Sequence, residues 1–497
     1  MVPLTVEPDW SERRSESEVA GSHIAPSAVF LLAAVVFALV LQGAFYRGPF
    51  LVFCVLIAAA AGLARWELHQ DRTRVSFGRS PTISNVFTVP VLCGAVVVTT
   101  SISAVANHRV TESLPTILAL IVATLSAWVV GVSMQSAKCF LLRGLVASGV
   151  GVAAIGFIGV VWHRKPLALV DGDLWRAAST LTYANATAAW LGLVLSSAIA
   201  FAGRGATARM RDRIQVAVIC GGLLLTGSRA GIAAAAAGVV TLGAVSGWRW
   251  LRSSLPSIVS GVALFFGAAI SMPAERSIPA LWRVAALVAG GFAALAILRF
   301  AMRNDATAGP DEQLRRTLPS ARTSAMAIVG VAVLFIAAFA LMMRDPALRS
   351  RFSISSPGRL DEWGAAIDRF RSSPIVGTGP GPISFELPGL PTRSVAYAHN
   401  EYLQVLAQQG VIGASILVIG LLGALRSLKR SFTRPSLFRI SAIVGCGVLG
   451  FHAWFDYVLH LPAILVGAAM LMALAATYED EEVNVKEFPA SIPFPPR

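Results

Sequence analysis

Long apolar segments recur along almost the whole chain and constrain its fold more than any other feature. A helix needs about 20 apolar residues to cross a hydrocarbon core, and roughly fourteen segments reach or approach that length. They lie near residues 27–45, 49–64, 85–106, 114–134, 140–161, 183–203, 213–226, 230–247, 255–271, 280–300, 323–343, 410–425, 439–455 and 461–478. Of the 497 residues, 55% are hydrophobic and 14% are charged, a balance that no soluble globular domain of this size shows. The chain is therefore predicted to be an all-α, polytopic membrane helix bundle of about 12–14 transmembrane helices.

The basic residues predict how this bundle is oriented. Lys and Arg accumulate in short cytoplasmic loops, and they fit an orientation with both termini in the cytoplasm. The basic clusters that then lie inside are 65–79, 204–213, 299–322 and 426–439. The net charge of +14 follows mostly from this distribution. Because the charges are spread over many short loops and form no stripe or arm, they do not indicate a nucleic-acid partner.

Only one segment outside the predicted spans is long enough to carry a reaction site. Residues 344–409 lie between the eleventh and twelfth spans, and the predicted topology places this loop on the outer face of the membrane. Residues 1–25 and 479–497 are rich in charge and proline and are expected to be disordered cytoplasmic tails. Residues 26–478 then form a single transmembrane domain of a multi-pass cell-membrane protein.

The first half of the outer loop has the pattern of an amphipathic helix. After a Ser-Pro-Gly turn, apolar residues at helical spacing occupy one face of Ser356–Phe370, and charged residues occupy the others. Such a helix is expected to lie on the membrane or on the bundle. The next stretch, Pro374–Pro391, is rich in glycine and proline and is expected to be irregular. It neither follows a strand nor opens a helix, so it does not fit a dinucleotide site.

His399 stands at the start of the next expected helix, which Gly410 is expected to end. The positive end of the helix dipole disfavours an imidazolium, so His399 is expected to be neutral and able to accept a proton. A neutral histidine is what a general base requires. A single histidine at a helix start can equally well cap the helix or bond to a neighbour, and the spacing alone leaves both interpretations open.

Several motifs of this chain resemble those of one family. His399-Asn400, followed after nine residues by Gly410 and after two more by Gly413, resembles the signature of the O-antigen ligase and polymerase superfamily. Other segments are similar to that family in the expected order, namely 183–185, 226–231, 358–363, 373–381 and 455–462. The resemblance covers roughly residues 180–475.

The resemblance implies a glycosyltransferase that acts outside the membrane without a cofactor or a metal ion. Its donor would be a glycan on undecaprenyl diphosphate, and its acceptor would be a hydroxyl group of a glycan, a lipid or a protein. A ligase and a polymerase of this family differ only in the acceptor, which the sequence does not identify. Membrane lipids are the surroundings in which both substrates would be bound.

The residues expected to act follow from this reaction. His399 would deprotonate the acceptor, and a one-step displacement would invert the anomeric centre. The leaving diphosphate needs cations near the outer surface, and a guanidinium suits phosphate oxygens better than an ammonium does. The expected catalytic arginines are Arg229 and Arg359, and the expected substrate-binding residues are Asn185, Arg276, Arg283, Asn400 and Tyr402. Each arginine could instead form only a salt bridge or a headgroup contact.

Two acidic motifs and one other class of protein compete with this interpretation. Asp171-Gly172-Asp173 has the spacing with which many sugar transferases hold a divalent ion, but we interpret it as a turn. Asp456 and His460 could form a second site or a structural hydrogen bond. A transporter or flippase of an anionic lipid-linked or small solute would also use arginines. It is expected to have broken helices in two matching halves, and none is seen in this sequence.

Overall fold

The structure is a computed structural model of the chain. It describes residues 24–74, 83–203, 208–246, 248–275, 278–306, 359–380, 383–385, 393–395, 397–433 and 436–477. The expected tails therefore lie almost wholly outside the described residues, as do the span expected at 323–343 and the first part of the outer loop. All statements on structure below refer to the residues that are described.

The described residues form mainly helices, as the apolar segments predict. The helices are α2 (Pro26–Val40), α3 (Arg47–Arg74), α4 (Ile83–Ala106), α5 (Val110–Val132), α6 (Gln135–Val161), α7 (Ala184–Ala202), α8 (Met210–Leu225), α9 (Arg229–Ser246), α10 (Trp248–Ala269), α11 (Ala280–Ala306), α15 (Arg359–Ser372), α16 (Glu401–Thr433), α17 (Leu437–Ala453) and α18 (Pro462–Thr477). Within the described ranges, nine helices are long and apolar enough to cross a membrane. Every predicted span that falls on these ranges corresponds to a helix, which confirms an all-α membrane bundle.

Two short antiparallel hairpins add strands that the sequence did not predict. One pairs β1 (Ala168–Asp171) with β2 (Leu174–Ala177), and the other pairs β3 (Ile383–Phe385) with β4 (Arg393–Val395). The second hairpin starts inside Pro374–Pro391, so that stretch is not irregular throughout. The first span is also shorter than expected, because α2 stops at Val40 and the backbone at 42–44 is left-handed.

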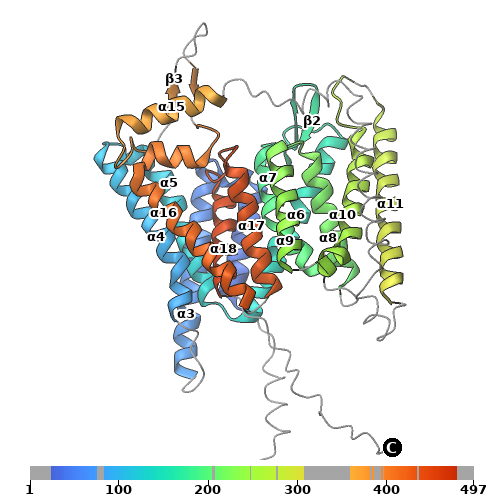
Figure 1. Cartoon of the computed structure of the whole chain (residues 1–497), viewed down its shortest axis with the longest axis horizontal. Coiled ribbons are helices and arrows are strands. Elements are labelled where there is room, and N and C mark those ends of the chain that lie inside the picture. Colours follow the sequence, from blue (N-terminus) through green and yellow to red (C-terminus); the bar gives the residue numbers. More distant parts are fainter. Residues whose placement is uncertain are drawn as a thin grey trace, which may run out of the picture.

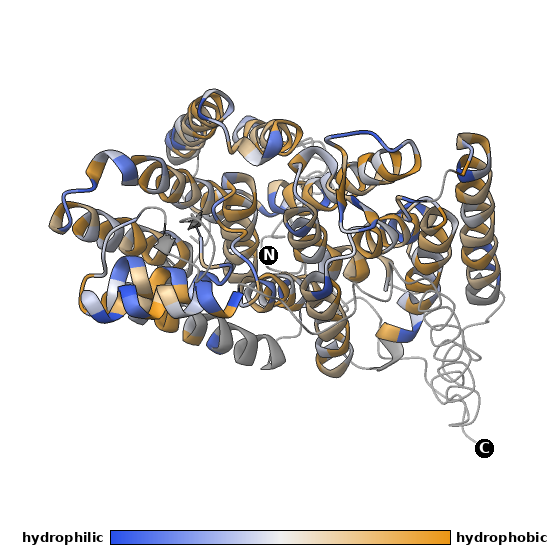
Figure 2. Ribbon diagram, turned by 90° about the horizontal axis from the view of Figure 1, so that it is seen from above, coloured by the Kyte–Doolittle hydropathy of each residue, from blue (hydrophilic) through white to orange (hydrophobic). Residues whose placement is uncertain are grey.

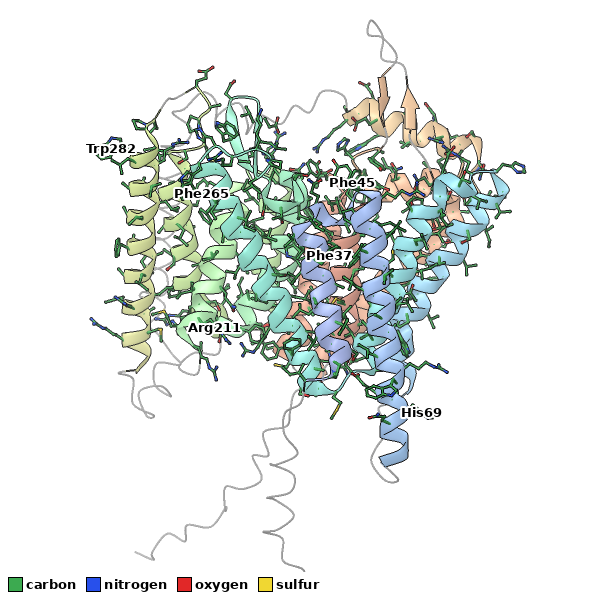
Figure 3. The ribbon with its side chains drawn as sticks, turned by 180° about the vertical axis from the view of Figure 1, so that it is seen from behind. Phe37, Phe45, His69, Arg211, Phe265 and Trp282 are labelled. Carbon is green, nitrogen blue, oxygen red and sulfur yellow. The ribbon has the colours of Figure 1, made fainter. Side chains whose placement is uncertain are left out.

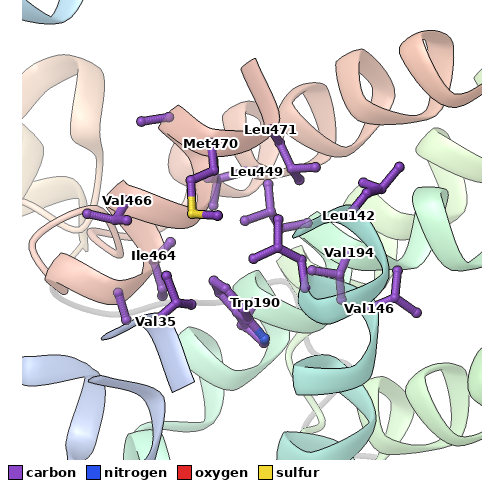
Figure 4. Packing of buried hydrophobic residues seen from close by; sticks show 14 of the residues in the cluster. Val35, Leu142, Val146, Trp190, Val194, Leu449, Ile464, Val466, Met470 and Leu471 are labelled. Atoms are coloured by element: carbon purple, nitrogen blue, oxygen red, sulfur yellow. The ribbon is translucent and has the colours of Figure 1, made fainter. Parts of the chain in front are cut away.

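Helix α7 lies at the centre of the bundle and is buried along almost its whole length. It packs against α6, α8, α9 and α17. Trp190 of α7 is fully buried, and a Cβ on Gly467 of α18 would lie only 2.4 Å from its ring. Figure 4 shows this ring among aliphatic side chains from several helices. A glycine in α18 thus allows close helix contact in the membrane, and this contact fixes the position of α7.

The elements of the outer loop lie at one end of the bundle. Helix α15 and the β3–β4 hairpin cover α4, α5 and α16, and the β1–β2 hairpin lies at the same end beside α10 (Figure 1). Figure 2 shows orange, hydrophobic ribbon over most of the bundle and alternating blue and orange along α15. Figure 3 places Arg211 and His69 at the opposite end from Phe45 and Trp282. Within the described residues, the parts of two basic clusters that carry His69 and Arg211 thus lie at the end of the bundle opposite α15. Which end faces the cytoplasm remains a prediction.

Candidate active site

The amphipathic helix predicted at 356–370 is observed as α15, Arg359–Ser372. Acidic residues occupy its first turn and basic residues its last turn, which complements the helix dipole. Its buried residue, Ala366, packs on Ala398 and on Ala407 of α16. The helix therefore lies on the bundle and faces the segment that carries His399.

A glycine-rich loop, residues 373–380, holds the first part of α16 in place. Gly410 interrupts α16 with φ 61° and ψ −160°, which confirms the predicted helix break. This break exposes backbone groups that the glycine-rich loop binds: Thr378 N donates to Ala407 O at 2.9 Å, and Gly379 N donates to Gln408 O at 3.1 Å. A Cβ on Gly410 would lie 2.3 Å from the carbonyl oxygen of Ile375. The glycines of both motifs thus permit one close backbone contact.

His399 precedes α16 and pairs with a carboxylate of α15. Its Nδ1 lies 2.8 Å from Oε2 of Glu362. A carboxylate accepts hydrogen bonds, so Nδ1 carries the proton and Nε2 faces away from Glu362. The side chain of His399 is 36% exposed and that of Glu362 is 15% exposed. The imidazole is therefore oriented by protein and still reachable from outside.

The pKa of His399 shifts in the direction opposite to the one that the helix dipole alone predicts. The hydrogen bond that His399 donates to Glu362 raises the pKa of His399, while burial and the charge of Arg359 oppose this rise. The helix dipole acts as about half a charge at the helix end. A full carboxylate charge at 2.8 Å has the opposite sign and is stronger. His399 nevertheless fits the role of a base, because a raised pKa makes the imidazole a better proton acceptor.

Asn400, not His399, caps α16. The Oδ1 atom of Asn400 accepts hydrogen bonds from the backbone N–H groups of Tyr402 and Leu403, both at 3.0 Å. Asn400 is 2% exposed, so its oxygen is committed to the cap. The hydroxyl of Tyr402 donates to the carbonyl of Gly450 in α17 at 2.8 Å. Both residues thus fix the start of α16 directly behind His399.

A second polar cluster surrounds Asp456, which lies in the turn between α17 and α18. The Tyr183 hydroxyl donates to its carboxylate at 2.8 Å, and the Nδ2 group of Asn185 donates to the same oxygen. Asp456 is 1% exposed. Burial and the Asp456 charge raise the pKa of Tyr183, and the charge of Arg359 opposes this. Tyr397, two residues before His399, stacks on Tyr457, the neighbour of Asp456, with a centroid distance of 4.1 Å, so the two polar clusters are adjacent.

Arg176 is a buried charged residue that the sequence analysis missed. It lies in β2, and it forms an ion pair with Asp171 at the other end of the hairpin. Its Nη2 donates to Asn185 Oδ1 at 2.8 Å, and its Nε donates to the carbonyl of Thr226 at 2.7 Å. The Asp-x-Asp motif is the turn of this hairpin, with Gly172 at φ 61°, which confirms the predicted turn. No local pattern distinguishes Arg176 from the other arginines.

The remaining predicted residues are distributed over the bundle. Arg229 is the first residue of α9. It lies three residues after Thr226, whose carbonyl accepts the hydrogen bond from Arg176 Nε. Arg283 lies on α11, which packs against α6, α8 and α10 and is far from α15 (Figure 1). Arg276 lies outside the described residues.

Asp456 and His460, considered together from the sequence, have different partners. The His460 ring stacks on Tyr457 and Tyr397, with centroid distances of 4.7 and 4.9 Å. Burial lowers the pKa of His460 to about 4, so this ring is a neutral part of an aromatic cluster. Tyr397 thereby ties the segment before His399 to the turn that carries Asp456.

Comparison with known families agrees with the motifs. The family model described as O-antigen ligase matches residues 280–418, a range that contains Arg359, Glu362 and His399. Asn185, Arg229 and Asp456 lie outside that range, and the fold brings Asn185 and Asp456 into contact. A search among curated proteins gives no match. Residues 280–418, less than a third of the chain, are thus similar to the O-antigen ligase family.

Proposed function

We propose that the chain is a membrane glycosyltransferase that moves a glycan from an undecaprenyl-diphosphate-linked donor to an acceptor hydroxyl on the outer face of the membrane. The O-antigen ligase domain supports a glycan ligase or polymerase in general. The observation that carries the residue assignment is the pair formed by His399 and Glu362. A base oriented by a hydrogen-bonded carboxylate is the arrangement that activates a weak nucleophile in many acyl transferases.

In the proposed reaction, Nε2 of His399 takes the proton of the acceptor hydroxyl. The acceptor oxygen attacks the anomeric carbon, and the bond from that carbon to the phosphate oxygen breaks. The lipid diphosphate leaves with the electron pair, and the anomeric centre is inverted. Glu362 stabilises the imidazolium that forms, because its carboxylate accepts the Nδ1–H bond.

The negative charge that develops on the diphosphate requires cations. Arg359 begins α15 three residues before Glu362, and its charge already acts on His399. Arg229, at the first residue of α9, is proposed as the second phosphate ligand. No metal ion enters this scheme, because guanidinium groups supply the electrostatic stabilisation.

The other predicted residues are assigned supporting roles. Asn400 and Tyr402 have their polar oxygens bonded to protein, so we assign them to holding His399 in place. Asn185 accepts from Arg176 and donates to Asp456, and we assign it to holding these two charged side chains in place. Arg276 and Arg283 are not part of this proposed reaction centre. The acceptor is a glycan, lipid or protein hydroxyl, and the same site geometry serves a ligase and a polymerase.

The test is His399→Ala in the full-length protein, with His108→Ala as the matched control. His108 is exposed in the turn between α4 and α5, which contacts the glycine-rich loop through Asn107. Transfer from a defined undecaprenyl-diphosphate-linked donor should fall roughly 100- to 10,000-fold in His399→Ala, the usual effect of a general base. His108→Ala should stay near wild type. If His399→Ala is well expressed in the membrane and transfers glycan normally, His399 is not the base.

A further inference from the structure

A cleft at the other side of the bundle is not used by the proposed reaction. It has a volume of about 460 Å³ and lies between the end of α6 and the turn from α10 to α11. Its lining includes His163, Glu275, Pro279 and Arg283. In Figure 1, α11 and α15 stand at opposite sides of the bundle. Whatever binds this cleft is therefore separate from the substrate that faces His399.

Arg283 is the feature that the fold itself does not explain. Its Nε and Nη1 atoms are buried and have no hydrogen-bond partner among the described residues. Glu275 lines the same cleft, but no ion pair joins it to Arg283. Leaving a buried charged group without a partner costs about 1–3 kcal/mol or more. By contrast, Arg176 and Arg143 each pair with a carboxylate.

The surroundings of Arg283 favour an anion as the missing partner. Arg283 lies in the first turn of α11, where the helix dipole is positive. His163 lines the same cleft and stacks on Trp175 with a centroid distance of 4.7 Å, and its Nε2 lies 2.9 Å from the carbonyl of Ser271. Burial lowers the pKa of His163, and the charge of Arg283 lowers it further. A negative group between the two side chains would remove this repulsion.

The position of the cleft indicates where the anion comes from. Leu281 and Trp282 follow directly after the cleft-lining residue Ala280 and are 75% and 65% exposed. Figure 3 shows Trp282 pointing outward at the end of α11. Exposed Trp at a helix end is typical of the membrane interface, where lipid headgroups lie. Arg164 and Lys165 are exposed next to His163 and add positive charge to the same surface.

We infer that the cleft between His163 and Arg283 binds the phosphate group of a lipid in the adjacent leaflet. A guanidinium with two unpaired nitrogens matches two phosphate oxygens. A glycerophospholipid and a polyprenyl carrier both present such a phosphate at the membrane surface, and the experiment below distinguishes them. This inference does not depend on the transfer reaction, because it rests on the cleft, the unpaired Arg283 and the interfacial position.

The experiment compares wild type, Arg283→Gln and Arg303→Gln as full-length proteins in neutral detergent. Arg303 is the matched control, because it lies on the same helix in its last turn. Native mass spectrometry would count bound molecules of phosphatidylglycerol, undecaprenyl diphosphate and inorganic phosphate, each added alone. We expect Arg283→Gln to bind one molecule fewer of either phosphatidylglycerol or undecaprenyl diphosphate than wild type, with an affinity reduced about tenfold or more. Arg303→Gln should bind both lipids as wild type does. The probe that is lost identifies the source of the phosphate.

A stability measurement separates a binding role from a structural one. Because Arg283 has no partner among the described residues, Arg283→Gln should not lower the melting temperature without added lipid. It should abolish the rise in melting temperature that the bound lipid gives to wild type. The inference is overturned if both variants keep all lipid copies, if only inorganic phosphate binding is lost, or if Arg283→Gln melts at a lower temperature without lipid.

Discussion

Replacing Glu362 by Gln tests the base assignment more sharply than removing His399. The amide keeps the size of the side chain and removes the charge that orients Nδ1–H. A hydrogen bond to a charged group contributes about 1.5–3 kcal/mol, which corresponds to roughly 10- to 150-fold in rate. The His399 side chain is 36% exposed, so water can replace part of this bond. We therefore expect an effect at the lower end of this range, about a tenfold decrease in the plateau rate of transfer.

The pH dependence gives a second and independent signature. A base must be unprotonated, so the transfer rate falls when the pH drops below the pKa of His399. Glu362 raises that pKa through its hydrogen bond, and the charge of Asp456 also raises it. In Glu362→Gln the main cause of the rise is gone, so the acidic limb should move to lower pH while the plateau decreases.

The assay is transfer from a defined undecaprenyl-diphosphate-linked donor between about pH 5 and 8, with the membrane level of each variant measured alongside. Asp361→Asn is the matched control, because Asp361 is the exposed acidic neighbour in the same first turn of α15. It should leave both the plateau and the acidic limb in place. An unchanged acidic limb in Glu362→Gln would refute the assignment of His399 as the titrating base.

Three further predictions follow from other contacts. Arg229→Lys should raise the KM for the donor more than it lowers kcat, because the ammonium group of lysine lacks the planar pair of donors with which a guanidinium binds two phosphate oxygens. Steady-state kinetics check this. Arg176→Met should lower the free energy of unfolding by about 1–3 kcal/mol, because Thr226 O and Asn185 Oδ1 lose their donor; thermal unfolding of the purified protein checks this. In a cysteine-free background, an impermeant thiol reagent should label Asp368→Cys in intact cells and spare His69→Cys, which lies at the opposite end of the bundle (Figure 3); the reverse result would invert the topology.

The sequence predicted those features that depend on local pattern. Apolar length located the spans, helical spacing located α15, and Gly410 located the break in α16. Asp171-Gly172-Asp173 was interpreted as a turn, and the structure has the turn of a hairpin there. Each of these features is determined by residues a few positions apart, so one sequence is enough to predict it.

The contacts that complete the site join residues far apart in the chain. Glu362 and His399 are 37 residues apart, and Asn185 and Asp456 are 271 apart. Periodicity carries no information on such pairs, so the carboxylate beside His399 was not predicted. The direction of the His399 pKa shift was missed for the same reason, because the sequence shows the local helix dipole and not the distant carboxylate. Arg176 was missed because its acceptors come from three separate segments.

The Asp456 cluster and the His399–Glu362 pair are positioned by different parts of the fold. Asn185 belongs to α7, which is packed on nearly every side, so the Asp456 cluster is fixed by the core of the bundle. The His399–Glu362 pair joins α15 to the residue two positions before α16 begins at Glu401. The start of α16 is anchored to the bundle, because Tyr402 donates to the carbonyl of Gly450 and Glu401 accepts from Leu459 N at 2.6 Å. The geometry of the proposed base thus depends on the contact between α15 and the residues before α16. Its position relative to the Asp456 cluster depends on the hydrogen bonds of Glu401 and Tyr402 at the start of α16.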